Sequence, residues 1–381
     1  MYSVDAYGRM IADDKRTGAY IRALKLAIQP GSVVVDIGTG PGFFAMLACK
    51  LGARRVYAIE PDNVIQVARD CARMNGFSDR IEFIQDLSTN VTLPETADVI
   101  VADLRGVLPF FQTNLPSVQD AANRFLAKNG ILIPLRDHLF AAIAHAPEIY
   151  RKLEAPWGQR EGITLAAGRR VVVNTWSKNR VEKADVLCDH VLWHTITYDK
   201  IDSFDVAAQM SFAVTRSGTA HGVVAWFESD LLDGISMSNA PGEPELLYGN
   251  AFFPLAQPVD LDAGDNIEFR IRADLIKDEY VWSWETRICD GQDTKLVKTH
   301  LKQSSLFGAP FTRDHLKKRA SSFVPVLDEQ AVVSSFILSQ IDGKSSIEQL
   351  AAKVAEKFPL RFASAAAAMD VVAEVSAKYS K

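Results

Sequence analysis

The first third of the chain alternates between short apolar runs and longer stretches in which apolar residues recur at helical spacing. The apolar runs are rich in Val and Ile, as expected of buried strands, and they cover residues 33–37, 55–60, 81–84, 97–103 and 130–134. Ahead of them, Tyr20, Leu24 and Ile28 follow one another at spacings of four. This pattern predicts a helical cap and then a parallel sheet covered on both faces, together an α/β Rossmann-like domain of residues 1–135.

After residue 135 the chain changes to short segments that alternate in polarity or are rich in aromatic residues. Four such segments are separated by Gly, Asp and Pro, and they cover residues 191–196, 206–214, 221–228 and 267–271. They predict an antiparallel domain, a barrel or a sandwich, of residues 136–300. Residues 301–320 carry five basic residues against one acid, together with Gly308 and Pro310, which predicts a linker.

The tail of the chain has a periodicity of its own. It predicts a short strand at 323–328, a helix at 331–341 and a last helix at 364–379. Between these helices, Ser346 with Gln349 predicts a capping box at the start of a further helix. We therefore expect a small α+β domain over residues 321–381.

Composition and charge limit the classes of protein that fit. A chain of 381 residues, 48% of them hydrophobic, is long enough for two or three domains with substantial cores. A net charge of −5 gives no case for a nucleic-acid surface. The four cysteines include no Cys-x-x-Cys pair, which fits reduced thiols in a cytoplasmic protein and no metal site. The charged start excludes a secretory signal, and no apolar run reaches the roughly 18 residues that a membrane span needs.

A strand, a tight turn and a helix meet at one glycine-rich stretch. The run 33–37 is followed by three glycines at alternate positions, Gly38, Gly40 and Gly42, and glycine lets the backbone close around a ligand. The next strand ends at Glu60, whose carboxylate can accept both hydroxyls of a ribose. Because the carboxyl ends of neighbouring parallel strands lie together, the sequence predicts a nucleoside site there.

Two kinds of cofactor compete for this site. The dinucleotide fingerprint G-x-G-x-x-G has a different spacing, and Asp36, just before the turn, would repel a pyrophosphate but attract an ammonium or sulfonium group. The stretch 36–42, with Glu60 after it, resembles motif I of the class I methyltransferases. The resemblance implies S-adenosylmethionine as the cofactor, S-adenosylhomocysteine as the product, and an adenine beside Asp86, Leu87 and Ser88. Asp86 could equally cap a turn.

The amino-terminal cap carries a second resemblance. Residues 10–20 fit the pattern M-x-x-D-x-x-R-T-x-x-Y and resemble the cap of the protein arginine methyltransferases. This resemblance implies that Arg16 binds the cofactor carboxylate through its forked guanidinium group and that Met10 lies beside the sulfonium. Without the resemblance, Arg16 would be read as an ordinary surface arginine on a helix.

Three fragments of this antiparallel domain resemble the β-barrel domain of the same family, in the same order, so the resemblance implies a β-barrel. They are His221–Glu228, Ser238–Pro241 and Gly264–Ile267. The resemblance thus covers most of residues 2–290. It implies a homodimer whose subunits pair head to tail through an arm on the barrel.

The loop 103–112 departs from that family. Its counterpart carries two glutamates that orient a guanidinium toward the methyl group, and those positions fall here on Asp103 and the neutral Gln112. The family's T-H-W signature falls on Leu246–Tyr248, which lacks the histidine. A guanidinium would be poorly held by half a charge clamp, and Arg105 would repel it unless Arg105 faces solvent or pairs with Asp103. We therefore expect a rebuilt acceptor site with Asp103 and Gln112 as catalytic residues, Asp103 acting as base or orienting the acceptor.

The tail resembles the PqqD-like domains, which are small winged-helix modules. The resemblance lies in the turn Asp342-Gly343 and in the helix start Ser346–Ala351. It implies that the tail binds the leader of a peptide under modification, with the leader added as a strand to a sheet edge. A plain helical appendage is the alternative.

The sequence thus predicts a cytoplasmic S-adenosylmethionine-dependent methyltransferase that acts on a peptide or a small metabolite. Two alternatives stay open. One is a residual arginine methyltransferase in which Asp103 alone holds the guanidinium, and the other is a non-catalytic scaffold that binds the cofactor or a peptide. No nucleic acid and no membrane are expected as partners.

Overall fold

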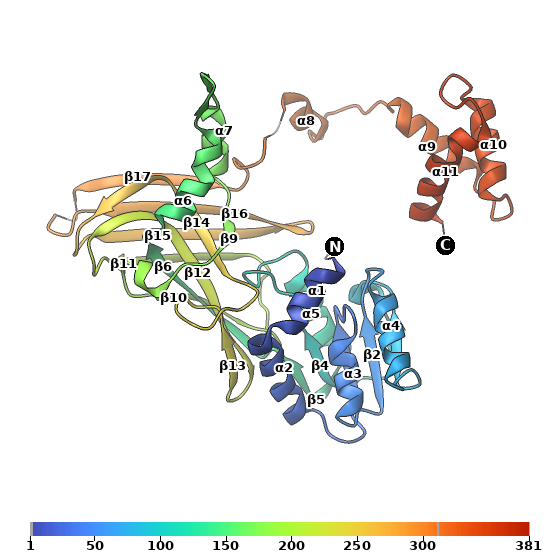
Figure 1. Ribbon diagram of the computed structural model, residues 1–381, viewed down its shortest axis with the longest axis horizontal. Coiled ribbons are helices and arrows are strands. Elements are labelled where there is room, and N and C mark those ends of the chain that lie inside the picture. The colour runs from blue at the N-terminus through green and yellow to red at the C-terminus, as the bar shows by residue number, and fades with distance from the viewer. Residues whose placement is uncertain (1–2, 294, 311, 381) are drawn as a thin grey trace. The chain divides into compact units, whose positions relative to one another are not determined.

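The computed structural model describes residues 3–293, 295–310 and 312–380 of the chain. These residues form two compact units that divide after Pro310 (Figure 1). Residues 1 and 2 of the predicted cap, residue 311 of the predicted linker and residue 381 of the predicted tail domain lie outside the described residues. Each helix in the described ranges is too short or too polar to pass through a lipid bilayer.

The first unit begins with two cap helices, α1 (Val4–Ala12) and α2 (Asp14–Ala27). Asp13 lies between them and caps α2, since its side chain accepts a hydrogen bond from the Arg16 amide at 3.0 Å. Tyr20 and Leu24 are buried on the face of α2 that packs on the rest of the unit. The cap and the turn before α2 thereby fix the position of Arg16.

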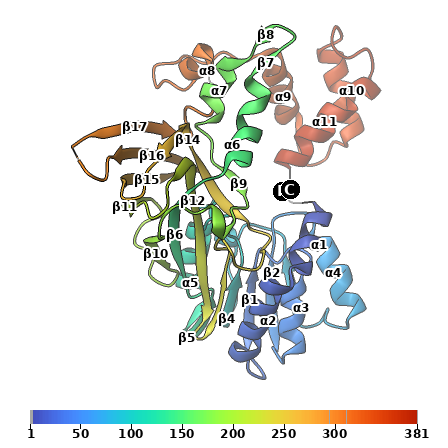
Figure 2. The ribbon, with the colours of Figure 1, turned by 60° about the vertical axis from the view of Figure 1, so that its left-hand side comes forward.

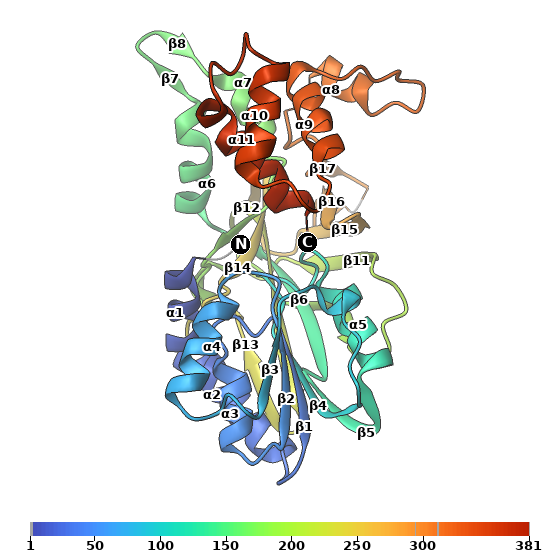
Figure 3. The ribbon, with the colours of Figure 1, turned by 90° about the vertical axis from the view of Figure 1, so that its right-hand side faces the viewer.

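A five-stranded parallel sheet follows, with the strand order β3-β2-β1-β4-β5. Its strands are β1 (Val33–Ile37), β2 (Arg55–Ile59), β3 (Ile81–Ile84), β4 (Ala97–Ala102) and β5 (Leu126–Ile133). Figure 3 shows helices α3 (Phe43–Lys50) and α4 (Ile65–Met74) on one face and α5 (Asn114–Arg124) on the other. The predicted Rossmann-like fold of this part is confirmed. Because the strand order reverses between β1 and β4, their carboxyl ends border a crevice.

The rest of the first unit is built from antiparallel sheets, as predicted. One sheet has the order β10-β6-β12-β14-β9 with β13 paired to β12, and the other has the order β11-β15-β16-β17. The strands are β6 (Arg136–Ala144), β9 (Ser177–Asn179), β10 (Val191–Thr197), β11 (Val206–Ala213), β12 (Gly218–Leu232), β13 (Ile235–Ser238), β14 (Asn250–Leu261), β15 (Asn266–Ile276), β16 (Glu279–Cys289) and β17 (Val297–Ser304). One hydrophobic core runs through the parallel and the antiparallel sheets, so the two parts pack as one body.

An arm is inserted between β6 and β9. It consists of α6 (Pro147–Glu154), the hairpin of β7 (Gln159–Arg160) and β8 (Ile163–Thr164), and α7 (Ala166–Val172). The hairpin lies at the tip of the arm, away from the antiparallel sheets (Figure 2). At this tip Ile163 is 65% exposed.

The predicted linker starts too early, because residues 301–304 belong to β17, which pairs with β16. The exposed Lys302 is followed by the buried Gln303, whose amide donates hydrogen bonds to the carbonyl oxygens of Val173 and Pro254 at 2.5 and 3.0 Å. The linker was predicted from the number of basic residues, and this criterion does not detect the alternation of exposed and buried side chains that is typical of a half-buried strand.

The second unit is helical in its described residues. Its helices are α8 (Arg313–Lys318), α9 (Glu329–Gln340), α10 (Ile347–Lys357) and α11 (Ala365–Tyr379). Ser346 and Gln349 form the predicted capping box at the start of α10. Helices α9, α10 and α11 share a small core that includes Val333, Ile337, Leu350, Val354 and Val372.

The strand predicted at residues 323–328 is not found. This stretch is irregular, with Val324 and Val326 exposed at 79% and 87%, and residues 312–380 contain no strand. A strand must pair its backbone groups with a neighbour, and these helices offer no sheet edge. The second unit is therefore a helical bundle where we predicted an α+β, winged-helix-like domain.

Candidate functional site

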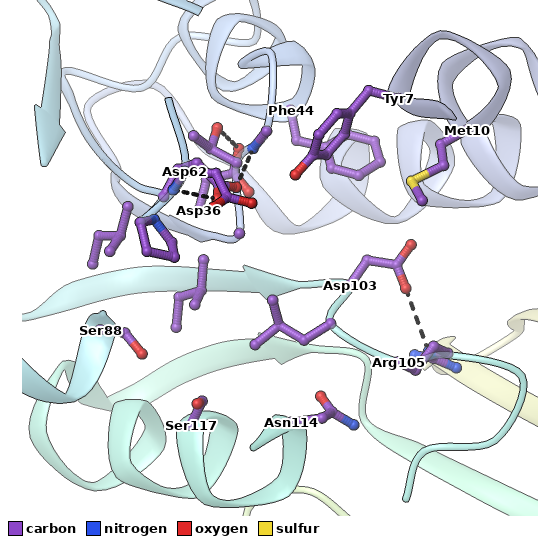
Figure 4. A pocket seen from close by; sticks show the side chains of 18 of the residues that line it. Tyr7, Met10, Asp36, Phe44, Asp62, Ser88, Asp103, Arg105, Asn114 and Ser117 are labelled. Carbon is purple, nitrogen blue, oxygen red and sulfur yellow. Dashed lines mark hydrogen bonds and ion pairs between the residues drawn. The ribbon is translucent and has the colours of Figure 1, made fainter. Parts of the chain in front are cut away.

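A pocket of about 370 Å³ lies at the carboxyl ends of β1, β2 and β4 (Figure 4). Tyr7 and Met10 of the cap line it, and so does Tyr248 of the antiparallel part. The residues predicted for the site that line this pocket are Met10, Arg16, Asp36, Gly38, Gly40, Glu60, Leu87, Ser88, Asp103 and Gln112. Gly42 and Asp86 are outside its lining.

The three glycines of the turn all have positive φ, with values of 69° at Gly38, 52° at Gly40 and 83° at Gly42. A side chain at Gly40 would meet the ring of Tyr7 at 2.7 Å, whereas one at Gly42 would lie 2.9 Å from the Cβ of Ala68 on α4. Gly38 and Gly40 therefore keep the cavity open, and Gly42 allows two helices to pack closely.

Glu60 is buried in the wall of the pocket, directly after β2. Its Oε2 accepts the amide N–H of Gly40 at 3.0 Å, and its Oε1 accepts that of Asp62 at 3.0 Å. These bonds fix the carboxylate, and each oxygen keeps a lone pair for a further donor. The arrangement suits the predicted contact with two neighbouring hydroxyls.

Asp36 lies in β1 and is 2% exposed. Thr39 donates its hydroxyl to Oδ2 of Asp36 at 2.6 Å. Burial raises the pKa of Asp36 to about 7, because hydrogen bonds from Thr39 and from the Ala45 amide only partly offset the desolvation of the carboxylate. A cation placed in the pocket would stabilise the ionised form.

Asp86 lies just before the turn at Ser88–Asn90. Its Oδ1 accepts the Leu87 amide at 2.7 Å and the side-chain amide of Asn90 at 2.9 Å, which are contacts of the turn role that the sequence left open. The adenine role of Asp86 stays a prediction. Leu87 and Ser88 remain in the lining of the pocket.

Arg16 is buried against Asp103, so the reading of Arg16 as an ordinary surface arginine is excluded. Its Nε and Nη2 lie 2.7 and 2.5 Å from Oδ2 of Asp103. Tyr248 donates its hydroxyl to the same oxygen at 2.5 Å. Oδ2 of Asp103 is thus surrounded by donors.

A second arginine flanks Asp103 on its other oxygen. Nε of Arg105 lies 3.4 Å from Oδ1 of Asp103, and Nη1 of Arg105 donates to Oδ1 of Asp137 at 2.8 Å. Asp137, in β6, is fully buried and also accepts the hydroxyl of Tyr198 at 2.7 Å. We call Arg16, Asp103, Arg105 and Asp137 the ion chain, because their charges alternate in sign from one residue to the next.

The ion chain keeps Asp103 ionised. Burial alone would raise the pKa of Asp103, but Arg16 and Arg105 outweigh this effect and hold the pKa below its usual value. A carboxylate with a lowered pKa accepts a proton poorly near neutral pH. The geometry therefore favours Asp103 as an orienting group and disfavours it as a base.

The residues in or behind this site that were not predicted as site residues include Tyr7, Asp137, Tyr198 and Tyr248. Tyr248 could have been found, since it stands at the last position of the T-H-W signature. Asp137 and Tyr198 gave no signal, because a single polar residue at a strand end does not show which side chain it will meet.

Two family models match the chain. One, described as ribosomal protein L11 methyltransferase, matches residues 14–133, and one, described as the arginine methyltransferase oligomerization subdomain, matches residues 138–284. The chain is 27% identical over 281 residues to an arginine N(omega)-methyltransferase of Streptomyces achromogenes subsp. streptozoticus. The aligned region covers 69% of this chain and 74% of that protein. It is also 27% identical over 236 residues to the probable protein arginine N-methyltransferase 6 of Arabidopsis thaliana, with 59% of this chain and 54% of that protein covered.

Two solved structures share the fold. The Trypanosoma brucei PRMT1 enzyme-prozyme heterotetrameric complex with AdoHcy has a TM-score of 0.71 at 19% identity, covering 78% of this chain and 96% of that one. Arabidopsis thaliana protein arginine methyltransferase 10 has a TM-score of 0.69 at 19% identity, covering 80% of this chain and 98% of that one. At this identity the likeness concerns the fold alone.

Proposed function

We propose that this S-adenosylmethionine-dependent methyltransferase, whose fold is that of the arginine methyltransferases, methylates a peptide or a small metabolite in a rebuilt acceptor site. The enzyme class and the cofactor predicted from the sequence are confirmed by the relatives. One observation carries the proposal of a rebuilt site. Asp103 lies between two arginines of the chain itself, and Gln112, at the second glutamate position, is neutral.

The pocket suits the cofactor. Gly38 and Gly40 leave one wall bare, Glu60 presents carboxylate oxygens to a ribose, and Asp36 offers its charge to the ammonium or sulfonium group. The other proposed contacts are Met10, Arg16, Leu87 and Ser88. When bound, S-adenosylmethionine supplies an electrophilic methyl group. The residues of the chain have to place an acceptor in line with it and keep water away.

Binding and transfer test the proposal separately. We expect the full chain to bind S-adenosylhomocysteine saturably in a calorimeter and to transfer a labelled methyl group from S-adenosylmethionine to a peptide or metabolite. Cofactor binding without transfer to any acceptor would identify a scaffold. Heat with a nicotinamide dinucleotide, and none with S-adenosylhomocysteine, would exclude the cofactor.

We expect the affinity for S-adenosylmethionine to fall as the pH drops below 7. In the free protein the pKa of Asp36 is about 7, so the carboxyl becomes protonated below that pH. A bound cation favours the ionised form, so binding at lower pH must release a proton, and the dissociation constant should rise about tenfold per pH unit. Above pH 7 the carboxylate is already ionised, and this dependence disappears.

Calorimetric titrations between about pH 5.5 and pH 8 measure this effect. The Asp36→Asn variant is the control, because its amide cannot titrate, and its affinity should stay flat below pH 7. A wild-type profile as flat as that of the variant would show that Asp36 does not sense the cofactor.

A residual arginine methyltransferase is the second candidate. The names of the relatives favour it, and Asp103 still offers one carboxylate to a guanidinium. Such an acceptor would have to compete with Arg16 and Arg105 for Asp103. Incubating the full chain with arginine-rich peptides and methyl-labelled S-adenosylmethionine separates this candidate from the first, because label in those peptides would favour a residual arginine methyltransferase.

Two partners complete the proposal. The arm would pair two copies of the chain head to tail, which the name of the matching oligomerization model and the exposed Ile163 at the tip support. The second unit would bind the leader of a peptide, as PqqD-like domains do. The Asp342-Gly343 turn and the capping box before α10 support this assignment, although the described residues of the unit offer no sheet edge to a leader.

A further inference from the structure

The guanidinium group of Arg16 is already occupied in this structure. Its Nε and Nη2 lie 2.7 and 2.5 Å from Oδ2 of Asp103, so one side of the group is covered by a carboxylate of the chain itself. On the other side, Nη1 donates to the carbonyl oxygen of Met10 at 3.1 Å. A second carboxylate can be bound through two parallel hydrogen bonds only if Arg16 releases one of these partners.

The two oxygens of Asp103 carry very different numbers of contacts. Oδ2 faces two nitrogens of Arg16 and also accepts the Tyr248 hydroxyl, although a carboxylate oxygen has only about two lone pairs. Oδ1 is buried and makes no hydrogen bond within the described residues. An unpaired acceptor of this kind is costly in a protein core. Asp103 is therefore held on one oxygen and left unsatisfied on the other.

Arg105 offers the donor that Oδ1 lacks. Its Nε lies 3.4 Å from Oδ1 of Asp103, and within the described ranges this buried N–H makes no hydrogen bond either. Figure 4 shows the two side chains facing each other. Arg105 itself is anchored, because its Nη1 donates to Asp137 and the two side chains are 1% and 0% exposed. A small movement of Asp103 toward Arg105 would satisfy both unpaired atoms.

We infer that Asp103 changes partner when the cofactor binds. Arg16 turns from Asp103 to the cofactor carboxylate, and Nε of Arg105 then donates to Oδ1 of Asp103. The inference rests on the proposed function and makes Arg105 a positioning residue of its acceptor site. Oδ2 of Asp103 keeps the Tyr248 hydroxyl and gains a lone pair for an N–H or O–H group of the acceptor. The acceptor site is thus completed only after the cofactor has bound.

Asp103→Asn tests the release of Arg16 by calorimetry on the full chain. An amide holds a guanidinium more weakly than a carboxylate does, so we expect S-adenosylhomocysteine to bind about tenfold more tightly to the variant. 5′-Methylthioadenosine has the same adenosine and thioether but no carboxylate, and its affinity should stay unchanged. Asp62→Asn is the control. Asp62 lines the other side of the pocket, so this variant removes the same charge without freeing Arg16 and should gain no affinity.

Arg105→Lys tests the residue that receives Asp103. Lysine keeps a positive charge for Asp137, but it lacks the Nε–H that faces Asp103. That N–H bonds nothing in the free protein, so its loss should affect only the cofactor-bound state. We expect the affinity for S-adenosylhomocysteine to fall about tenfold and that for 5′-methylthioadenosine to stay unchanged. In the Asp103→Asn background the same change should alter the affinity by less than about twofold.

The outcomes separate this inference from the proposed function. A thermal melt shows which variants are folded, and either single variant is a sufficient test if the other fails to fold. The inference would be overturned by a folded Asp103→Asn protein that does not gain affinity for S-adenosylhomocysteine, or gains it equally for 5′-methylthioadenosine. A folded Arg105→Lys protein with unchanged affinities would overturn it too. An unchanged chain that binds no S-adenosylhomocysteine would overturn the proposed function as well.

Discussion

Replacing Arg105 with methionine is expected to lower the free energy of unfolding of the first unit by about 3 to 5 kcal/mol. The side chain of Arg105 is 1% exposed and that of Asp137 is 0% exposed, so the variant leaves Asp137 charged in the core with only the Tyr198 hydroxyl as a partner. Methionine is flexible enough to fill much of the space, which limits the contribution of a cavity. Urea unfolding followed by tryptophan fluorescence measures the loss, because all six tryptophans lie in the first unit.

Two controls separate the ion chain from the general effect of removing an arginine. Arg151→Met breaks the ion pair between Arg151 and Glu148, whose side chains are 63% and 70% exposed, respectively. This variant should change the free energy of unfolding by less than about 1 kcal/mol. The double variant Arg105→Met with Asp137→Leu should recover most of the loss, because it leaves no unpaired carboxylate at position 137. If the double variant lost as much as the two single variants together, the two charges would not be coupled.

Replacing Glu60 with glutamine is expected to raise the dissociation constant for S-adenosylhomocysteine by roughly 10- to 100-fold, as expected when a charge-assisted hydrogen bond is lost. Glu60 holds the Gly40 and Asp62 amides on its two oxygens. Glutamine keeps one acceptor oxygen, but its NH₂ group would face a backbone N–H that now donates to the Glu60 carboxylate. Two donors would then point at each other. The variant would weaken the predicted hydrogen bonds to the ribose and would disturb the conformation of the glycine turn. Calorimetry with S-adenosylhomocysteine measures the change.

Glu82→Gln is the matched control for Glu60→Gln. Glu82 lies on β3, outside the pocket, and its side chain is 44% exposed and paired with Arg55. The affinity of the Glu82→Gln variant for S-adenosylhomocysteine should therefore equal that of the unchanged chain. A thermal melt of each variant shows whether it remains folded. A folded Glu60→Gln protein with unchanged affinity would remove Glu60 from the proposed site.

The parts of the site that the sequence predicted are those in which neighbours along the chain act together. Asp36, Gly38 and Gly40 lie on one strand and its turn, and Glu60 ends the adjacent parallel strand, so topology alone brings them to one crevice. The capping box of Ser346 and Gln349 was predictable for the same reason, since both partners lie within one helical turn.

The parts that escaped prediction depend on distant partners. Arg105 could be read as solvent-facing or paired, and only the packing of β6 against the loop after β4 puts Asp137 beside it. Tyr248 reaches Asp103 from 145 residues away along the chain. In the second unit, the apolar residues 323–328 have the composition of a strand, but strand formation needs a neighbouring strand, which local composition cannot report.

The ion chain also sets a rule for recombining this protein with its relatives. It starts in the cap, passes through the loop after β4 and ends on the first strand beyond the expected boundary at residue 135. A chimera joined at that boundary would inherit Arg105 from one parent and residue 137 from the other, and would bury an unmatched charge whenever the second parent lacks an acid there. In any such chimera, the residues at positions 105 and 137 must therefore come from the same parent.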